Sequence, residues 1–145
     1  MIVAVFDTNV LASGIAGIAR PESTPGELLR RWRAKAFTLV VSEPILTELV
    51  RTFTNPYFSR RLSPADIAAA LARFQTEAHV QQITAHVSGV ATHLQDDVIL
   101  ATALGAQAPY LVTGDKPLLE RGAYEGTRLL SPRQFLALLD HHSGA

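Results

Sequence analysis

The 145-residue chain contains no cysteine. It therefore forms no disulfide bond, uses no thiolate as a nucleophile and binds no zinc through sulfur. It also lacks an apolar run of about 18 residues, the length that a membrane-spanning helix requires. Asp7 interrupts the N-terminal apolar run too early for a signal peptide. We therefore expect a cytoplasmic protein with no membrane association.

Neither sign of charge is in excess, because 13 basic residues balance 13 acidic ones. Net charge thus gives no general argument for a nucleic-acid partner. The basic residues are unevenly placed, however, and eight of them fall in the first 61 positions: Arg20, Arg30, Arg31, Arg33, Lys35, Arg51, Arg60 and Arg61. Arginine suits phosphate because its planar fork contacts two oxygens at once. Solvent-exposed helix faces explain each of these residues equally well.

The remaining composition is that of a globular domain, with 48% apolar and 18% charged residues. A chain of this length is large enough for one domain with its own core. We find no internal repeat, low-complexity segment or linker in it. The sequence therefore predicts a single domain over residues 1–140, followed by a tail over residues 141–145.

The chain begins with a short apolar run, Ile2–Phe6, which is β-branched at positions 2, 3 and 5 and shows no polar alternation. This pattern predicts a strand that is buried on both faces, as in a parallel sheet. Similar strands are predicted at 37–41, 110–113 and 128–130, with a weaker one at 79–84. Helical patterns separate them, so we predict an α/β sandwich around a mainly parallel sheet.

Capping signals and apolar residues at helical spacing predict the helices. Thr24-Pro25-Gly26-Glu27 has the form of a capping box with proline at the first helical position. The helix after Ser42 has its apolar residues on one side, at Ile45, Leu46, Leu49, Val50 and Phe53. Further helices are predicted after Ser63 and Ser131 and over 98–104, with a turn over 114–117.

Two acids follow predicted strands, Asp7 directly and Asp115 two residues after Thr113. Parallel strands end at the same edge of a sheet, where ligands bind in open α/β folds. Asp96 and Asp97 stand at the start of a helix, whose positive terminus favours ionised carboxylates. Aspartate is also a preferred helix cap, and we expect one of these two to be the cap.

A fourth acid comes from the helix that follows Ser42. A helical wheel places Glu48 at one border of the buried stripe and Glu43 near the opposite border, so the wheel does not choose between them. Converging carboxylates need a cation, because like charges raise each other's pKa. Oxygen ligands suit Mg²⁺ or Mn²⁺. Such metal sites usually act on phosphates, where the ion orients a phosphoryl oxygen and supplies hydroxide.

Four segments resemble PIN-domain proteins, in particular the VapC-like ribonuclease toxins of bacterial toxin–antitoxin modules. They are VFDTNVLASG, SEPILTELVRTF, DDVILATALGAQAPYLVTGD and LLSP, in the order of that family. The resemblance implies a PIN-like three-layer α/β/α fold and an endoribonuclease that depends on Mg²⁺ or Mn²⁺. It also implies an RNA substrate, a cognate antitoxin of a type II module, and homodimerisation.

The resemblance also assigns roles to residues. It implies four catalytic acids that bind the metal, namely Asp7, Glu48, Asp96 and Asp115. Family members place the third acid seven residues before the alanine of an Ala-Leu pair, which selects Asp96 from Ala103-Leu104 and leaves Asp97 beside it. Asn9 and Thr113 match the supporting amide and hydroxyl. The chain departs from the family at 93–95, where members often carry Asp-Pro, and Asp115 matches the family's least uniform acid.

Two other classes fit less well. A haloacid-dehalogenase-like phosphatase needs a second aspartate two residues after the first, where this chain has Asn9. A receiver-like signalling domain needs an aspartate after a later strand, where this chain has Ser42. The alternative that stays open is a non-catalytic PIN-fold module that binds protein or RNA.

Overall fold

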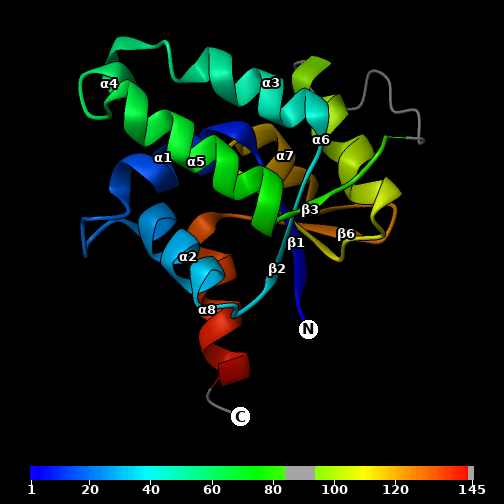
Figure 1. The fold of residues 1–145 in the computed structure, drawn as a ribbon. Helices are drawn as coiled ribbons and strands as arrows, with labels where there is room; N and C mark the ends of the chain where they lie inside the picture. The colour runs from blue at the N-terminus through cyan, green and yellow to red at the C-terminus, as the bar shows by residue number, and fades with distance from the viewer. Residues whose placement is uncertain (84–93, 144–145) are drawn as a thin grey trace.

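The computed structural model describes residues 1–83 and 94–143, with side chains of the second range given from 97 to 142. Its strands form one six-stranded sheet in the order β3-β2-β1-β4-β6-β5 (Figure 1). Their bounds are β1 Val3–Phe6, β2 Thr38–Val41, β3 His79–Val80, β4 Tyr110–Val112, β5 Ala123–Tyr124 and β6 Thr127–Leu130. Only the β5–β6 pair is antiparallel among the described strand pairs, so the predicted, mainly parallel sheet is confirmed.

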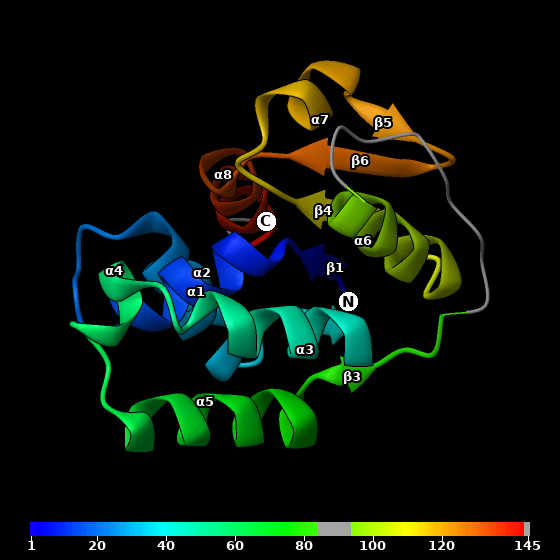
Figure 2. The ribbon, with the colours of Figure 1, turned by 90° about the horizontal axis from the view of Figure 1, so that it is seen from above.

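Helices connect the strands and flank the sheet. Their bounds are α1 Thr8–Gly17, α2 Thr24–Arg33, α3 Glu43–Thr52, α4 Pro56–Ser59, α5 Pro64–Glu77, α6 Leu94–Gly105, α7 Lys116–Arg121 and α8 Pro132–Ser143. Helix α6 packs on β1, β2 and β4, whereas α8 packs on β6 and α2. Figure 2 shows α6 on one side of the central strands and α2 and α8 on the other. None of the helices in the described ranges has the length and apolarity needed to cross a bilayer.

The register brings the carboxyl ends of the central strands to one edge of the sheet. Phe6 of β1 pairs with Val112 of β4, and Val5 pairs with Val40 of β2. Below this edge, the rings of Phe6, Phe37 and Phe135 contact one another with centroids 5.1–5.7 Å apart. Strand β1 is therefore the buried centre of the sheet, as its unbroken apolar sequence predicts.

Two glycines allow α1 and α2 to pack closely. A Cβ atom on Gly17 would lie 2.1 Å from Ser23 Oγ, and one on Gly26 would lie 2.2 Å from the Gly17 carbonyl oxygen. Neither position has room for a larger side chain. This contact fixes the position of α1, whose first residues follow Asp7.

Several predicted details are wrong. Ser23, not Thr24, caps α2, because the Ser23 hydroxyl accepts the Gly26 N–H at 3.0 Å. The carboxylate of Glu27 binds Arg30 and Arg31 instead of closing a capping box, because these cations lie one helical turn away. Val50 is 49% exposed, since α3 buries the stripe formed by its other apolar residues and Val50 lies beyond the edge of that stripe.

Element boundaries account for the other differences. The predicted turn over 114–117 contains the start of α7, and α8 continues through Ser143, past the predicted boundary at residue 140. Strand β3 covers only His79–Val80, and residue 84, the last of the predicted strand, lies outside the described part. Helix α6 begins at Leu94, so Asp96 and Asp97 lie within its first turn and the expectation that one of them caps it is wrong.

Candidate functional site

The site begins where β1 ends. Asp7 follows the last residue of β1 and precedes α1, and its side chain is 7% exposed. Its backbone N–H donates to the Val112 carbonyl at 2.8 Å, which holds the aspartate against the end of β4. The carboxylate therefore lies at the carboxyl edge of the sheet, as the sequence predicts.

Thr113 joins this carboxylate to the second strand-end acid. The Thr113 hydroxyl donates to Asp7 Oδ2 at 2.8 Å and accepts the Asp115 N–H at 3.0 Å. Asp115 Oδ2 in turn accepts the Leu118 N–H at 3.0 Å and caps α7. The structure thus brings together three of the predicted site residues, Asp7, Thr113 and Asp115, through direct hydrogen bonds.

Asp7 is a buried acid, and its hydrogen bonds do not fully offset the effect of burial on its pKa. Burial raises the pKa of Asp7, and the negative charge of Asp115 adds to the rise. The Thr113 hydroxyl and the backbone N–H groups of Asn9 and Thr8 oppose it, but the net shift of the pKa is upward. A cation at this position would favour the ionised carboxylate.

Glu48 approaches the same edge from α3. Its side chain is 21% exposed, whereas Glu43 is exposed, so the structure distinguishes two acids that the helical wheel does not. A hollow of about 90 Å³ is lined by Thr8, Pro44, Ile45, Glu48, Val98 and Ile99. Glu48 therefore faces a space shared by the starts of α1 and α6. Arg51 donates to Glu48 Oε2 at 3.3 Å.

Of the two predicted acids of α6, the structure describes the side chain of Asp97 only. The side chain of Asp96 lies outside the described residues, so its assignment as a metal ligand stays a prediction. Asp97 is buried, and it directly precedes Val98 and Ile99, the two residues of α6 that line the hollow. Helix α6 packs on β1, the strand that leads to Asp7. The side chain of Asn9 is exposed, and its predicted supporting role stays a prediction.

Two buried hydroxyls near this edge were missed by the sequence analysis. Ser42 Oγ lies 2.9 Å from Thr102 Oγ1, and the Thr102 hydroxyl donates to the Val98 carbonyl at 2.9 Å. This bridge joins the end of β2 to α6. Ser42 follows β2 as Asp7 follows β1, and that position after a buried strand is the signal that could have identified it.

The donor chemistry fits a hard divalent cation. Carboxylate oxygens suit Mg²⁺ or Mn²⁺, and a cation beside Asp7 would offset the burial that raises its pKa. Among the side chains that the structure describes, no three acids or histidines lie close enough together to form a metal site. Of the four predicted acids, Asp7, Glu48 and Asp115 have described side chains, and hydrogen bonds through Thr113 join only Asp7 and Asp115 among these three.

Comparison with known families matches residues 3–117 to the PIN domain. The chain belongs to the PIN domain family. The matched range contains all four predicted acids of this PIN domain, and it runs from β1 to the start of α7. The three-layer PIN-like fold predicted from the sequence is confirmed.

Solved structures with this fold include two toxin-related proteins. VapBC2 from Rickettsia felis, bound to a DNA fragment from its promoter, matches with a TM-score of 0.58 at 17% identity, over 90% of this chain and 98% of that chain. VapC20 from Mycobacterium tuberculosis, described as a sarcin-ricin loop cleaving toxin, matches with a TM-score of 0.55 at 18% identity, over 86% and 98%. No curated protein matches the chain significantly. At these identities the likeness shows a common fold.

Proposed function

We propose that this PIN-domain protein is a metal-dependent endoribonuclease and the toxin of a type II toxin–antitoxin module. The observation that carries the proposal is the buried Asp7 carboxylate, which Thr113 holds beside Asp115 at the carboxyl edge of the sheet. Family membership and a structural relative described as a sarcin-ricin loop cleaving toxin support the same activity.

The proposed roles follow the donor set. Asp7, Asp96 and Asp115 would hold Mg²⁺ or Mn²⁺, and Glu48 would hold or position the ion and its water. When bound, the ion would stabilise charge on the scissile phosphate and favour the attack of water on phosphorus. Thr113 fixes the orientation of the Asp7 carboxylate, and the surrounding core keeps bulk water away from it.

The proposal extends to partners and location. The relative from Rickettsia felis is described as a VapBC pair, which supports a cognate antitoxin for this chain. Homodimerisation and a cytoplasmic location are part of the same proposal. Arginines of the first half of the chain, such as Arg51, would contact the phosphates of the RNA on either side of the scissile bond.

The test is cleavage of a mixed RNA pool by the purified protein with Mg²⁺, with Mn²⁺ and with a chelator. Asp7→Asn removes the buried charge at nearly constant shape, and we expect cleavage to be lost while the circular dichroism spectrum is kept. Asp140→Asn is the matched control, because Asp140 is an exposed acid on α8 that pairs with Arg31. The control is expected to cut normally.

The outcomes of this test distinguish a ribonuclease from a non-catalytic module that binds RNA or protein. Metal-dependent cutting that Asp7→Asn alone abolishes supports the nuclease. Cutting by Asp7→Asn at the rate of the wild type removes Asp7 from the mechanism. Absence of both cutting and Mn²⁺ binding in the wild type overturns the nuclease and favours a non-catalytic PIN-fold module.

A further inference from the structure

The turn that contains α4 is basic, and most of it is exposed. Residues 49–65 contain three arginines and no acid. The side chain of Arg51 is 71% exposed, and Arg60 and Arg61 are exposed as well. Within the described residues, neither Arg60 nor Arg61 forms an ion pair with a carboxylate. The turn therefore presents positive charge that the protein itself does not neutralise.

The same turn holds an aromatic ring at the surface. Tyr57 is 50% exposed, and the Arg61 guanidinium carbon lies 3.8 Å from its ring centroid. Arg61 Nη1 also donates to the Tyr57 carbonyl at 2.6 Å, so both the ring and the backbone of Tyr57 hold the guanidinium in place. The pair forms a stacked surface of an aromatic ring and a planar cation.

Buried neighbours keep this pair in place. The ring of Phe58 is buried and contacts Phe53 of α3 edge-to-face, with centroids 6.0 Å apart. Asn55 Oδ1 accepts the Tyr57 N–H at 2.9 Å and caps α4. Because backbone and core contacts already order the turn, a ligand that stacks on Tyr57 would lose little conformational entropy in ordering it.

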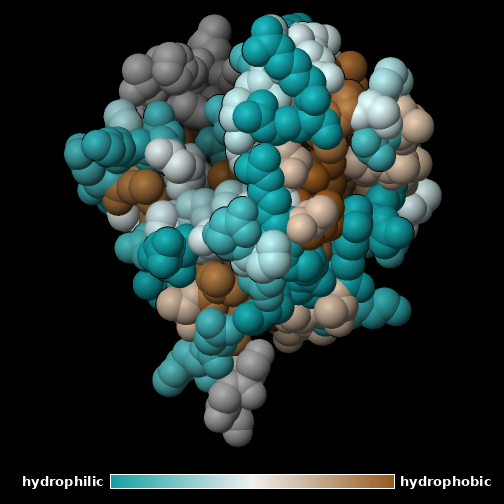
Figure 3. Space-filling model, turned by 90° about the vertical axis from the view of Figure 1, so that its left-hand side faces the viewer, coloured by the Kyte–Doolittle hydropathy of each residue, from teal (hydrophilic) through white to brown (hydrophobic). Residues whose placement is uncertain are grey.

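A hollow lined by both apolar and charged residues lies next to the arginine. It has a volume of about 360 Å³, and its lining includes Arg61, Ile15, Ile18, Leu62 and Asp66. Figure 3 views this side of the molecule and shows apolar surface recessed between hydrophilic side chains. The Asp66 carboxylate accepts the Ser63 N–H at 2.9 Å in the capping box of α5.

We propose that Tyr57, with Arg51, Arg60 and Arg61, forms a binding surface for single-stranded RNA. An unstacked base can stack on the Tyr57–Arg61 pair, and the arginines can contact the phosphates on either side of it. A duplex cannot use this surface in the same way, because its bases are already stacked on one another. As a surface for the enzyme's substrate, the assignment rests on the proposed ribonuclease function.

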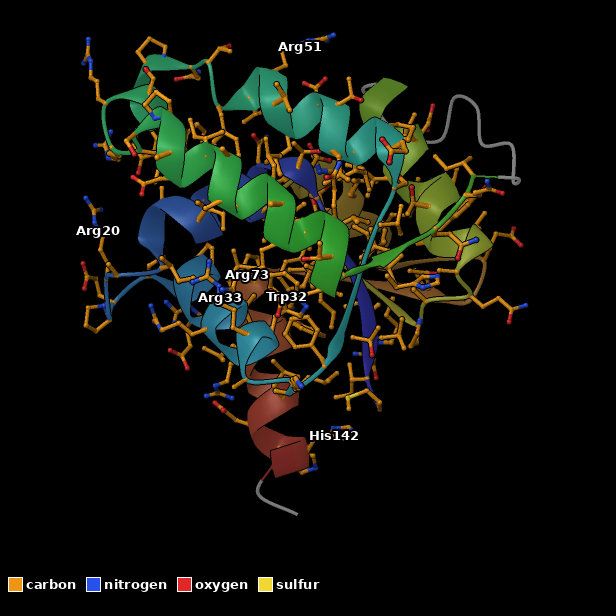
Figure 4. The ribbon with its side chains drawn as sticks, viewed as in Figure 1. Arg20, Trp32, Arg33, Arg51, Arg73 and His142 are labelled. Atoms are coloured by element: carbon orange, nitrogen blue, oxygen red, sulfur yellow. The ribbon has the colours of Figure 1, made fainter. Side chains whose placement is uncertain are left out.

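The position of the surface agrees with this role. Helix α4 follows α3, which carries Glu48, and Arg51 lies one helical turn from Glu48 and contacts it. Figure 4 shows Arg51 pointing outward from α3. A strand that leaves the acidic edge along α3 would therefore meet Arg51 first and then the α4 turn.

A second group of basic residues lies between α2 and α5 and is a weaker candidate. Figure 4 shows Arg33, Arg73 and Trp32 close together there. Arg73 pairs with Glu77 at 3.1 Å, and Trp32 is buried with its ring stacked on Phe74. This group offers less free charge and no exposed aromatic face.

The test measures RNA binding apart from cleavage. Full-length Asp7→Asn protein with a chelator is titrated into a short fluorescein-labelled RNA without secondary structure, and into the same RNA annealed to its complement. Tyr57→Leu is expected to raise the Kd for the single strand about 5- to 150-fold, the range for one lost stacked base. Its effect on the duplex should be smaller.

A double variant tests the charges separately. Arg60→Gln with Arg61→Gln is expected to reduce the slope of log K against log salt by about 1.4, which corresponds to two phosphate contacts to a single strand. The matched control is another Arg–Tyr pair, in which the Arg121 guanidinium carbon lies 5.3 Å from the Tyr124 ring centroid. Arg121→Gln with Tyr124→Leu should leave the Kd within about two-fold of the parent. Circular dichroism melting checks the fold of every variant.

Two results would overturn the inference. The first is an unchanged Kd for both the Tyr57 variant and the Arg60/Arg61 variant, and a change of molecular mass in light scattering beside it would assign this turn to a protein interface. The second is an equal loss of affinity in the control pair. RNA binding that the α4 variants lose in a protein whose wild type cuts no RNA would support the surface and count against the proposed nuclease, so the two failures are distinguishable.

Discussion

At the scale of single residues, Thr113 determines the arrangement of the acidic edge. Its hydroxyl has one proton to donate and lone pairs to accept, and it uses both functions, toward Asp7 and toward the Asp115 N–H. Burial makes these bonds consequential, because a buried polar group that loses its partner keeps the cost of its desolvation. The residue is fully buried.

Thr113→Val therefore tests this arrangement. Valine keeps the shape but cannot donate to Asp7, so we expect RNA cleavage and Mn²⁺ affinity to fall about 10- to 100-fold, as for other residues that orient metal ligands. Thr127→Val is the control, since the Thr127 hydroxyl is also buried but donates to the Ala108 carbonyl. An equal loss of cleavage in both variants would contradict the assigned role.

At the scale of elements, the close contact between α1 and α2 depends on glycine, which has no side chain, at positions 17 and 26. A Cβ atom on Gly26 would meet the backbone of Gly17, which cannot move aside as the end of a flexible side chain can. This packing holds α1, the helix that follows Asp7, in place. A shift of α1 against α2 would therefore also move the backbone next to Asp7.

Gly26→Ala is expected to destabilise the fold by about 1–3 kcal/mol, the usual cost of overpacking. Gly114→Ala is the control, because a Cβ atom at Gly114 meets nothing within 4 Å. Urea denaturation of the two variants measures the difference. Equal midpoints would show that α1 and α2 can separate without cost.

The stability of the fold should also depend on pH at this scale, because a cluster of charged side chains joins α2 to α8. Arg31 and then Arg30 lower the pKa of Glu27, and Arg31 also contacts Asp140 at 2.8 Å. A folded-state pKa below the unfolded value of about 4.5 adds stability above that value. This stability is lost as the pH falls through the folded-state pKa.

The matching measurement is the melting temperature of wild type and Glu27→Gln as a function of pH. We expect the wild type to be more stable at neutral pH by a modest margin, because the group is partly exposed and solvent screens it. The two curves should converge as the pH falls through the folded-state pKa of Glu27, which lies below its ordinary value. Parallel curves over the whole range would exclude a contribution from the ionised Glu27.

At the scale of the whole molecule, folding itself creates the acidic edge. Strands β1 and β4 are adjacent in the sheet although their residues are far apart in the chain. The unfolded chain has no such site. A divalent cation should therefore bind the folded state preferentially and stabilise it.

We expect saturating Mn²⁺ to raise the melting temperature of the wild type, with a gain of about 2.7 kcal/mol when its concentration is 100 times the Kd. A chelator should reverse the gain, and Asp7→Asn should remove most of it. The same gain in Asp7→Asn would place the metal elsewhere. Differential scanning calorimetry provides the measurement.

Much of this architecture is local in origin and therefore predictable. The strands β1, β2, β4 and β6 lie within one residue of their predicted bounds, because short, mainly apolar runs between helical segments have few alternatives in a buried sheet. The beginning of α7 was missed because Asp115, Lys116 and Pro117 fit a turn as well as a helix start. The Asp115 cap and the burial of Leu118 in the core favour the helix.

By itself, the sequence determined that strands end at Asp7 and near Asp115, and that a parallel sheet would bring those ends to one edge. Tertiary structure alone decided which groups meet there. Thr113 and Asp7 are 106 residues apart, and only the register of β1 against β4 places the hydroxyl 2.8 Å from the carboxylate. The same is true of Ser42 and Thr102, and of the lower exposure of Glu48 compared with Glu43. Periodicity reports which side of an element is apolar, but hydrogen bonds and burial depend on the neighbours that the complete fold supplies.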